Sequence, residues 1–412
     1  MRKQIPIEQL RVGMYVVGLD RSWIETPFWR HRMQVESLDH IEALRACGVR
    51  SVEIDTEKGL DLASQGGIVS TGDPSSARTV DFSSSRASSP QDKEPSTPFE
   101  EELYVAKEVY KQAKVVIGQA MGDAREGRGL DIEAVSKVSE GLLESVLRNT
   151  EALSSLSRLK SFDEYTFFHS VNVAILALAM GRHLGVPREA LSMLGLGALL
   201  HDIGKMKIPY DLLNAPRRLE AGEREIINQH VMRGAEYLSQ HAVLPEETLR
   251  PLLEHHERVD GSGYPAGRRR KDLSQFGLLT SVVDIYDAIT ADRVYHAGVP
   301  PHQALRQVYG LGLEGHLDLD AVRGLIQCLG RYPVGSCVRL STGEIGVVSR
   351  PNLADPSKPA LLLVMDGSTP CRPPKPVDLA EQPTQPSRTI VATVDPRQVG
   401  IDPNHVLDSL SA

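Results

Sequence analysis

Apolar residues recur every three or four positions through the middle of the chain. Between residues 133 and 147 the apolar positions are 134, 135, 138, 142, 143, 146 and 147, and residues 100–125 show similar spacing. This period predicts amphipathic helices. The same pattern, divided by glycine and proline, predicts further helices over residues 163–184, 188–203, 220–240, 246–256, 274–291 and 300–310. We therefore expect an all-α domain over residues 100–330.

The pattern differs at both ends of the chain. Residues 1–60 alternate apolar and polar positions in short runs, which predicts a small α+β N-terminal domain. Residues 61–99 are rich in serine and proline, so we expect a flexible linker. Over residues 331–412, short apolar runs predict a small β-rich C-terminal extension with a loose end from Pro370 to Pro376. The expected fold is thus multidomain.

Composition and charge narrow the class of protein. The 412 residues carry a net charge of −8, which disfavours a general binder of nucleic-acid polymers. The most apolar segment, Val171–Gly181, is too short to span a bilayer, and the N-terminus lacks the apolar run of a signal peptide. The four cysteines lie far apart without a CxxC pair. We expect a cytoplasmic protein without a membrane span, and its oligomeric state stays open.

The candidate chemistry centres on His201 and Asp202, which stand side by side after an apolar helical run. An imidazole and a carboxylate can bind one metal ion, and the second carboxylate oxygen can reach a neighbouring ion. Each such residue alone also fits an ordinary core or helix-end position. Together, five histidines and two aspartates at apolar helix segments would leave buried polar groups unpaired without a metal. They are His169, His201, Asp202, His230, His255, His256 and Asp284.

The number and type of these side chains indicate which metals fit. Seven ligands exceed the need of one zinc ion and suit two ions that share a carboxylate and a hydroxide. A nitrogen and oxygen set without thiolate favours iron or manganese, and nickel, cobalt and zinc are also compatible. We therefore expect two divalent transition-metal ions as cofactors.

In order and spacing, these residues resemble the HD-GYP family, a branch of the HD phosphohydrolase superfamily. The motifs are His169, His201-Asp202-Ile203-Gly204-Lys205, His230, His255-His256-Glu257-Arg258, Asp260-Gly261-Ser262-Gly263-Tyr264-Pro265 and Val283-Asp284-Ile285-Tyr286-Asp287-Ala288. The resemblance covers about residues 155–325. The first sixty residues also resemble the domain of unknown function that often precedes HD-GYP domains in bacteria. The resemblance implies that the all-α domain is an HD-type catalytic domain.

The resemblance implies a metal-dependent phosphodiesterase that hydrolyses cyclic di-GMP to linear pGpG and, in many members, onward to GMP. A hydroxide between the two ions would attack phosphorus in line with the departing ribose 3′ oxygen. Carried over by motif, one ion would be held by His169, His201, Asp202 and Asp284. Asp202 would bridge to the other ion, which His230, His255 and His256 would also hold.

Further motif positions receive roles from the same resemblance. Lys205, one helical turn after Asp202, would offset the charge that develops on the phosphoryl oxygens, so both residues are expected to be catalytic. Arg293 corresponds to an arginine that contacts phosphate in the family. Asp287 is expected to orient a ligand histidine rather than to bind metal.

A tight loop follows the paired histidines. Its two glycines and its proline turn the chain, and the resemblance adds substrate contacts by Gly263, Tyr264 and Pro265. It also implies docking of GGDEF-type diguanylate cyclases at this loop. The adjacent basic run, residues 267–271, is compatible with a solvated turn or with electrostatic steering of an anionic substrate.

Two positions depart from the family pattern. Tyr165 stands where members with three metals have glutamate, so we expect two metals. Residues 294–296 are Val-Tyr-His instead of the usual Pro-Tyr-Arg or Pro-Tyr-Lys, which weakens a second cation for phosphate. Two alternatives stay open: a sensor that binds cyclic di-GMP without cleaving it, and an HD-superfamily hydrolase of another nucleotide.

Overall fold

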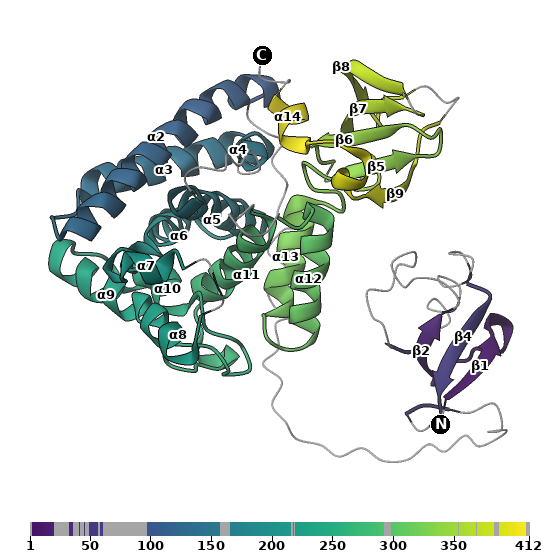
Figure 1. The fold of residues 1–412 in the computed structure, drawn as a ribbon, viewed down its shortest axis with the longest axis horizontal. Helices are drawn as coiled ribbons and strands as arrows, with labels where there is room; N and C mark the ends of the chain where they lie inside the picture. The colour runs from purple at the N-terminus through teal and green to yellow at the C-terminus, as the bar shows by residue number, and fades with distance from the viewer. Residues whose placement is uncertain are drawn as a thin grey trace. The chain divides into compact units, whose positions relative to one another are not determined.

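The computed structural model describes residues 2–19, 33–35, 41, 45, 49–56, 58–60, 97–156, 165–215, 217, 219–291, 298–352, 354–367, 369–382 and 387–408. The chain forms two compact units, residues 1–86 and 87–412. Figure 1 shows the ribbon of both units. Apart from residues 97–99, the expected linker over 61–99 lies outside the described residues.

The N-terminal unit contains a four-stranded antiparallel sheet. Its strands β1 (Arg2–Pro6), β2 (Tyr15–Leu19), β3 (Met33–Gln34) and β4 (Ser51–Asp55) lie in the order β1-β4-β2-β3. Val52 and Ile54 of β4 are fully buried, while the residues that alternate with them are half-buried. This period of two is that of a strand with one face on a core.

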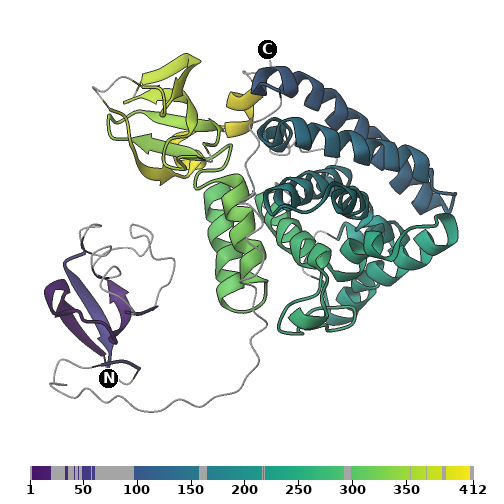
Figure 2. The same cartoon turned by 180° about the vertical axis from the view of Figure 1, so that it is seen from behind.

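Helices make up the middle of the second unit, and Figure 2 shows them from behind. Their bounds are α2 Phe99–Glu126, α3 Ile132–Arg148, α4 Thr150–Leu156, α5 Tyr165–His183, α6 Arg188–Leu200, α7 Tyr210–Leu213, α8 Ala221–Asn228, α9 His230–His241, α10 Glu246–Glu254, α11 Gln275–Thr290, α12 Pro301–Leu313 and α13 Leu319–Leu329. A 3₁₀ turn, η3 (Ile203–Lys207), follows α6.

The observed helices differ from the expected ones in two respects. The segment expected as one helix over 220–240 forms two helices, α8 and α9, with a turn at Gln229 between them. α8 buries none of its residues, whereas α9 buries five. The periodicity also did not predict α4 and α13. A signal for α13 was available in Asp318, whose side chain accepts the backbone N–H of Ala321 and caps the helix.

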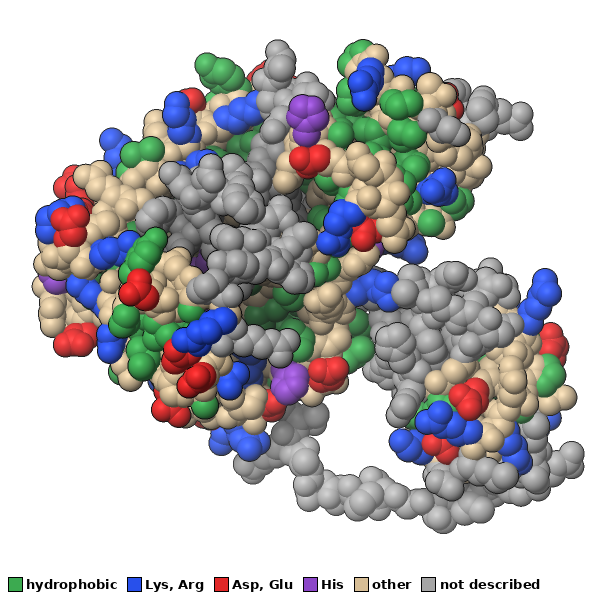
Figure 3. Space-filling view, viewed as in Figure 1, with side chains coloured by type: hydrophobic (Ala, Val, Ile, Leu, Met, Phe, Trp, Pro, Cys, Tyr) green, Lys and Arg blue, Asp and Glu red, His purple; other side chains and the backbone are tan. Residues whose placement is uncertain are grey.

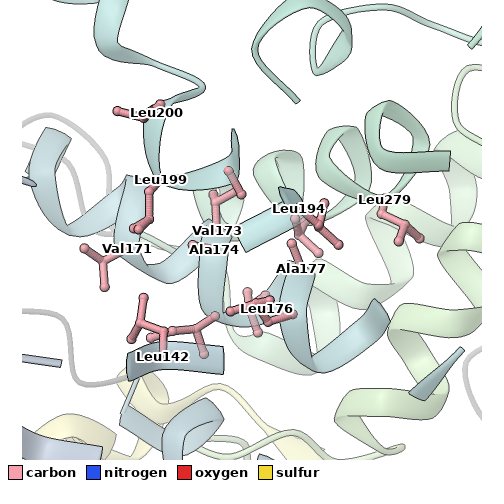
Figure 4. Packing of buried hydrophobic residues seen from close by; sticks show 14 of the residues in the cluster. Leu142, Val171, Val173, Ala174, Leu176, Ala177, Leu194, Leu199, Leu200 and Leu279 are labelled. Atoms are coloured by element: carbon pink, nitrogen blue, oxygen red, sulfur yellow. The ribbon is translucent and has the colours of Figure 1, made fainter. Parts of the chain in front are cut away.

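The central helix of this domain is α5. Its residues 171–180 are all buried, because α2, α3, α6, α11 and α13 pack around it. A helix that is apolar on all sides belongs in the interior of a domain. Figure 4 shows Val171, Val173 and Leu176 of this helix among Leu142, Leu194 and Leu279 of its neighbours. Within the described part of the chain, no helix is long and apolar enough to cross a membrane.

A five-stranded antiparallel sheet follows the helices. Its strands β5 (Cys337–Leu340), β6 (Ile345–Arg350), β7 (Ala360–Asp366), β8 (Thr369–Asp378) and β9 (Ile390–Val394) lie in the order β8-β7-β6-β5-β9. Both faces of the sheet are buried: Val347 and Leu362 belong to one cluster, and Val348 and Leu361 to another. The short helix α14 (Pro403–Asp408) packs against β6 and β7.

The expectation of a loose end from Pro370 to Pro376 is wrong. These residues belong to β8, which pairs with β7 on both sides of an irregularity in the register between Leu363 and Met365. Proline donates no N–H, but β8 is the edge of the sheet, where one side of the strand needs no donor. Closely spaced prolines therefore do not exclude a strand at this position.

The expected fold class is confirmed: an all-α domain lies between a small sheet-containing N-terminal domain and a β-rich C-terminal extension. On the face seen in Figure 3, acidic and basic side chains are interspersed over the helical domain rather than gathered by sign.

Candidate metal centre

His201 and Asp202 lie where α6 passes into η3. The buried residues Leu199 and Leu200 hold the end of α6 in the core, so the two polar side chains that follow are also completely buried. His201 donates from Nδ1 to the carbonyl oxygen of Ala198 at 2.7 Å, which directs Nε2 away from the helix. The apolar run thus brings an imidazole and a carboxylate into the interior together.

The structure gathers the seven candidate ligands into two clusters. In each cluster the donor atoms lie within 4.8 Å of one another. The first cluster contains His169, His201 and Asp284, and the second contains Asp202, His230, His255 and His256. The ligands come from α5, the end of α6, the start of α9, the end of α10 and the middle of α11.

Asp202 lies between the two clusters. Its Oδ1 is 3.5 Å from Nε2 of His230 and 3.6 Å from Nε2 of His255. Its Oδ2 is 3.5 Å from Nε2 of His201 and 3.7 Å from Nε2 of His169. Because each oxygen faces a different cluster, the carboxylate is placed to bridge two ions.

Main-chain carbonyl groups orient the histidine rings. Like His201, His230 places Nδ1 2.8 Å from a carbonyl oxygen one turn earlier, that of Ile227. Nδ1 of His255 is 2.9 Å from the carbonyl oxygen of Pro251. When Nδ1 carries the proton, Nε2 holds the lone pair that a metal requires. In all three rings, that Nε2 faces Asp202.

His169 contacts two carboxylates. Its Nδ1 is 2.8 Å from Oδ2 of Asp287, and its Nε2 is 2.9 Å from Oδ1 of Asp284. Burial lowers the pKa of His169, but hydrogen bonds to the two carboxylates outweigh burial and raise that pKa to about 9. The carboxylates around His169 therefore favour positive charge, the sign that a divalent ion carries.

The remaining electrostatics suit metal ligation. Burial lowers the pKa of His201 to about 4 and that of His230 to about 3, so both rings are neutral near pH 7, the form that binds metals. Burial also holds the pKa of His256 well below its usual range. For Asp202, burial acts to raise the pKa, but Lys205 and His201 outweigh it and hold the pKa well below the usual value. The carboxylate is therefore ionised.

Two orphaned atoms test whether the residues fit a metal. Nε2 of His201 and Oδ1 of Asp202 are buried and have no hydrogen-bond partner among the described residues. Leaving such groups unsatisfied costs about 1–3 kcal/mol each, more when the group is charged. A metal ion between the ligands would satisfy both atoms. The two clusters thus fit a binuclear centre of divalent ions.

Glycines let the ligand-bearing elements approach closely. A Cβ on Gly204 would overlap the carbonyl oxygen of His230 and crowd Gly234, so η3 and α9 meet backbone to backbone. A Cβ on Gly197 would overlap the carbonyl oxygen of Thr248, so α6 and α10 also meet closely. These contacts bring Asp202 beside the histidines of α9 and α10, and sequence reasoning missed them.

The loop after the paired histidines covers one side of the second cluster. The ring of Tyr264 stacks on that of His256, with centroids 4.6 Å apart and planes 25° apart. A Cβ on Gly263 would overlap the backbone N of Arg258, so only glycine fits there. Pro265 follows Tyr264 in the same loop. The structure therefore brings this loop and the candidate ligands together.

The structure describes some of the other expected site residues but not all of them. Lys205 donates to Oδ2 of Asp202, and its side chain is 23% exposed, so it lies at the open edge of the cluster. Arg293 lies outside the described residues, as do residues 294–296, and the side chain of Tyr165 is also outside them. In the basic run, Arg268 pairs with Glu254 and Arg270 with Asp318. Both of these charges thus have carboxylate partners within the protein.

Two family models match consecutive parts of the chain. A domain of unknown function (DUF3391) matches residues 2–135, and the HD domain matches residues 142–320. The second range contains all seven candidate ligands, which lie between residues 169 and 284. The helical fold and its buried histidine and aspartate clusters are therefore those of an HD-domain protein.

Individual relatives define the family further. Cyclic di-GMP phosphodiesterase PA4108 of Pseudomonas aeruginosa is 37% identical over 349 residues, which are 84% of this chain and 81% of the relative. The 3'3'-cGAMP-specific phosphodiesterase 3 of Vibrio cholerae is 33% identical over 170 residues, 41% of this chain and 36% of that protein. The chain belongs to the HD-GYP family, which confirms the resemblance drawn from its motifs.

Solved structures also show a likeness. Bd1817, a HDG"Y"P protein from Bdellovibrio bacteriovorus, is 18% identical with a TM-score of 0.41, and the match covers 79% of this chain and 98% of that chain.

Proposed function

We propose that this protein is a metal-dependent phosphodiesterase that hydrolyses cyclic di-GMP to pGpG and onward to GMP. The observation that carries the proposal is the position of Asp202, whose two oxygens face two separate buried clusters of ligands. The 37% identity to PA4108 over 84% of this chain supports the choice of substrate.

Two divalent ions, iron or manganese, are the cofactors we propose. His169, His201 and Asp284 would hold one ion, and His230, His255 and His256 the other, with Asp202 shared between them. When bound, such ions act as Lewis acids on a phosphoryl oxygen and lower the pKa of water so that a nucleophile exists near neutral pH. The absence of a thiolate from the set favours these metals, and nickel, cobalt and zinc remain compatible.

The chain's own residues have distinct roles in this proposal. Lys205 contacts the shared carboxylate and reaches solvent, so its ammonium group can offset negative charge on a phosphoryl oxygen. Asp287 fixes the ring of His169. Gly263, Tyr264 and Pro265 would contact the nucleotide, with Tyr264 supplying an aromatic ring for a base. Arg293, which lies outside the described residues, would supply a cation for phosphate.

The test is a chromatographic time course with cyclic di-GMP after anaerobic purification and metal analysis. The native chain should contain about two transition-metal ions and form pGpG and then GMP. The variant His201→Ala plus Asp202→Ala should lose both metal and product formation. The control variant Asp320→Ala plus His405→Ala changes the same residue types at exposed positions and should behave as the native chain.

A second candidate is hydrolysis of a different cyclic dinucleotide. The 33% identity to a 3'3'-cGAMP-specific phosphodiesterase favours testing this substrate. Parallel assays with cyclic di-GMP and 3'3'-cGAMP at equal concentration decide between the two. A larger kcat/KM for 3'3'-cGAMP would overturn the proposed substrate, and bound nucleotide without turnover under every metal would overturn the enzyme in favour of a sensor.

A further inference from the structure

Two buried carboxylates flank the paired histidines without belonging to either cluster. Glu254 is 1% exposed and Glu257 is 2% exposed, and they stand directly before His255 and directly after His256. Neither is among the groups that could hold a metal. A buried carboxylate requires several hydrogen-bond donors. The donors that contact Glu254 and Glu257 therefore indicate the structural role of each residue.

Glu257 closes the loop that carries Tyr264. Its Oε1 accepts the backbone N–H of Ala266 at 2.8 Å, and its Oε2 accepts that of Arg268 at 2.9 Å. Within the loop, the backbone N–H of Tyr264 donates to the carbonyl oxygen of His256 at 3.2 Å. The carboxylate of Glu257 therefore binds the far side of the loop, and Glu257 itself directly follows His256 in the chain.

Glu254 holds the same loop from a second direction. Its Oε1 accepts from Nη1 of Arg268 at 2.8 Å, while its Oε2 accepts from both N and Oγ of Ser274, at 2.8 and 2.7 Å. Ser274 caps α11, the helix that carries Asp284. Arg268 is thus fixed through its backbone by Glu257 and through its side chain by Glu254.

The loop fixed in this way lies against the second cluster. The Tyr264 ring stacks on His256 and meets the His230 ring edge-on, with centroids 6.3 Å apart. At Gly263 the loop backbone lies so close to that of residues 256–258 that a Cβ would overlap it. Displacement of the loop would remove the stacking partner of His256.

We propose that Glu257 is a positioning residue of the metal centre, which holds the Tyr264 ring on His256 and thereby retains the ion of the second cluster. This inference rests on the proposed metal centre but not on its substrate. The two backbone N–H groups donate to different oxygens of Glu257, and in a glutamine one of these oxygens is replaced by an NH₂ group, which accepts no hydrogen bond. The loop would lose one of its two attachments to residue 257.

The experiment measures metal release from the full chain into a chelator, without substrate. The variants are Glu257→Gln, Tyr264→Ala and the double variant, and Tyr264→Phe preserves the ring. We expect Glu257→Gln to release one of two ions about 10- to 100-fold faster, the usual effect of losing an outer-shell partner. Tyr264→Ala should do the same, and Tyr264→Phe should keep the native rate.

The double variant decides whether the two residues act through one contact. If Glu257 acts by positioning Tyr264, the double variant should release metal no faster than Tyr264→Ala alone. Effects that multiply, or a native release rate in Glu257→Gln, would overturn the inference. The control Glu246→Gln changes an exposed glutamate at the start of α10, away from the loop, and should leave the rate unchanged.

Two further measurements separate the possible failures. If Glu257→Gln does not fold, hydrogen exchange of the native chain replaces it: the Ala266 and Arg268 amides should be protected, and free exchange of both would overturn the inference. If metal release shifts as expected but cyclic di-GMP is not hydrolysed, the positioning role stands and the proposed substrate falls.

Discussion

Nδ1 of His169 lies 2.8 Å from Oδ2 of Asp287, one helical turn from the carboxylate of Asp284 that faces the other nitrogen of the same ring. One turn of α11 thus supplies both carboxylates that contact the His169 ring. A carboxylate behind a ligating imidazole fixes the ring and increases its basicity. The pair Asp284 and Asp287 therefore fixes the ring of His169, and in the proposed centre Asp287 would also increase the basicity of that ring.

Asp287→Asn should weaken metal binding. The amide keeps the size of the side chain but removes its negative charge, so we expect about 10- to 100-fold lower affinity for one ion. Titration of the metal-free chain against a competing chelator measures this affinity. Asp320→Asn, at an exposed position, is the matched control. An unchanged affinity would show that His169 does not need the charge behind it.

Lys205→Met should lower kcat with little loss of metal. If the ammonium group stabilises charge only in the transition state, its removal should cost about 10²–10³ in kcat. Metal analysis and steady-state kinetics on the same preparation separate the two effects. Lys207→Met removes a neighbouring lysine that lies over the ring of Tyr237 and should keep kcat near the native value. A rise in KM alone would instead make Lys205 a binding residue.

Gly204→Ala should destabilise the helical domain. The new methyl group would overlap the carbonyl oxygen of His230, and overpacking of this kind costs about 1–3 kcal/mol or more. Gly118→Ala, within α2, is the opposite case, because a Cβ at Gly118 would contact no neighbouring segment. We expect its free energy of unfolding to rise by about 0.5–1 kcal/mol. Urea unfolding measures whether Gly204→Ala lowers and Gly118→Ala raises the free energy of unfolding. Equal midpoints would contradict the close approach of η3 and α9.

Cys328 and Cys337 should resist thiol reagents in the native protein. Burial raises the pKa of each thiol to about 12, so at pH 8 only on the order of 10⁻⁴ of either is thiolate. Of the three cysteines in the described part of the chain, Cys371 is half-buried and should react first. Peptide mapping after iodoacetamide treatment, with and without denaturant, measures this order. Rapid native labelling of Cys328 would show that the packing around α13 opens readily.

The candidate ligands are easier to predict from the sequence than the residues that hold them in place. Histidines such as His169 on apolar helix faces can be recognised in the sequence, because burial of a polar group costs free energy unless the group has a partner. The sequence does not predict the roles of Gly204, Glu254 and Glu257, because these roles depend on which backbone atoms approach from distant segments. Pro370 misleads for a similar reason, since only sheet order shows that β8 is an edge.

The candidate ligands of the proposed centre come from five separate places between His169 and Asp284, so bound ions would cross-link the domain through its interior. Such a cross-link exists only in the folded chain. A ligand present at 100 times its dissociation constant stabilises the state that binds it by about 2.7 kcal/mol, a large share of the stability of an ordinary domain. Metal supply would then govern how long the folded protein survives as well as how fast it works.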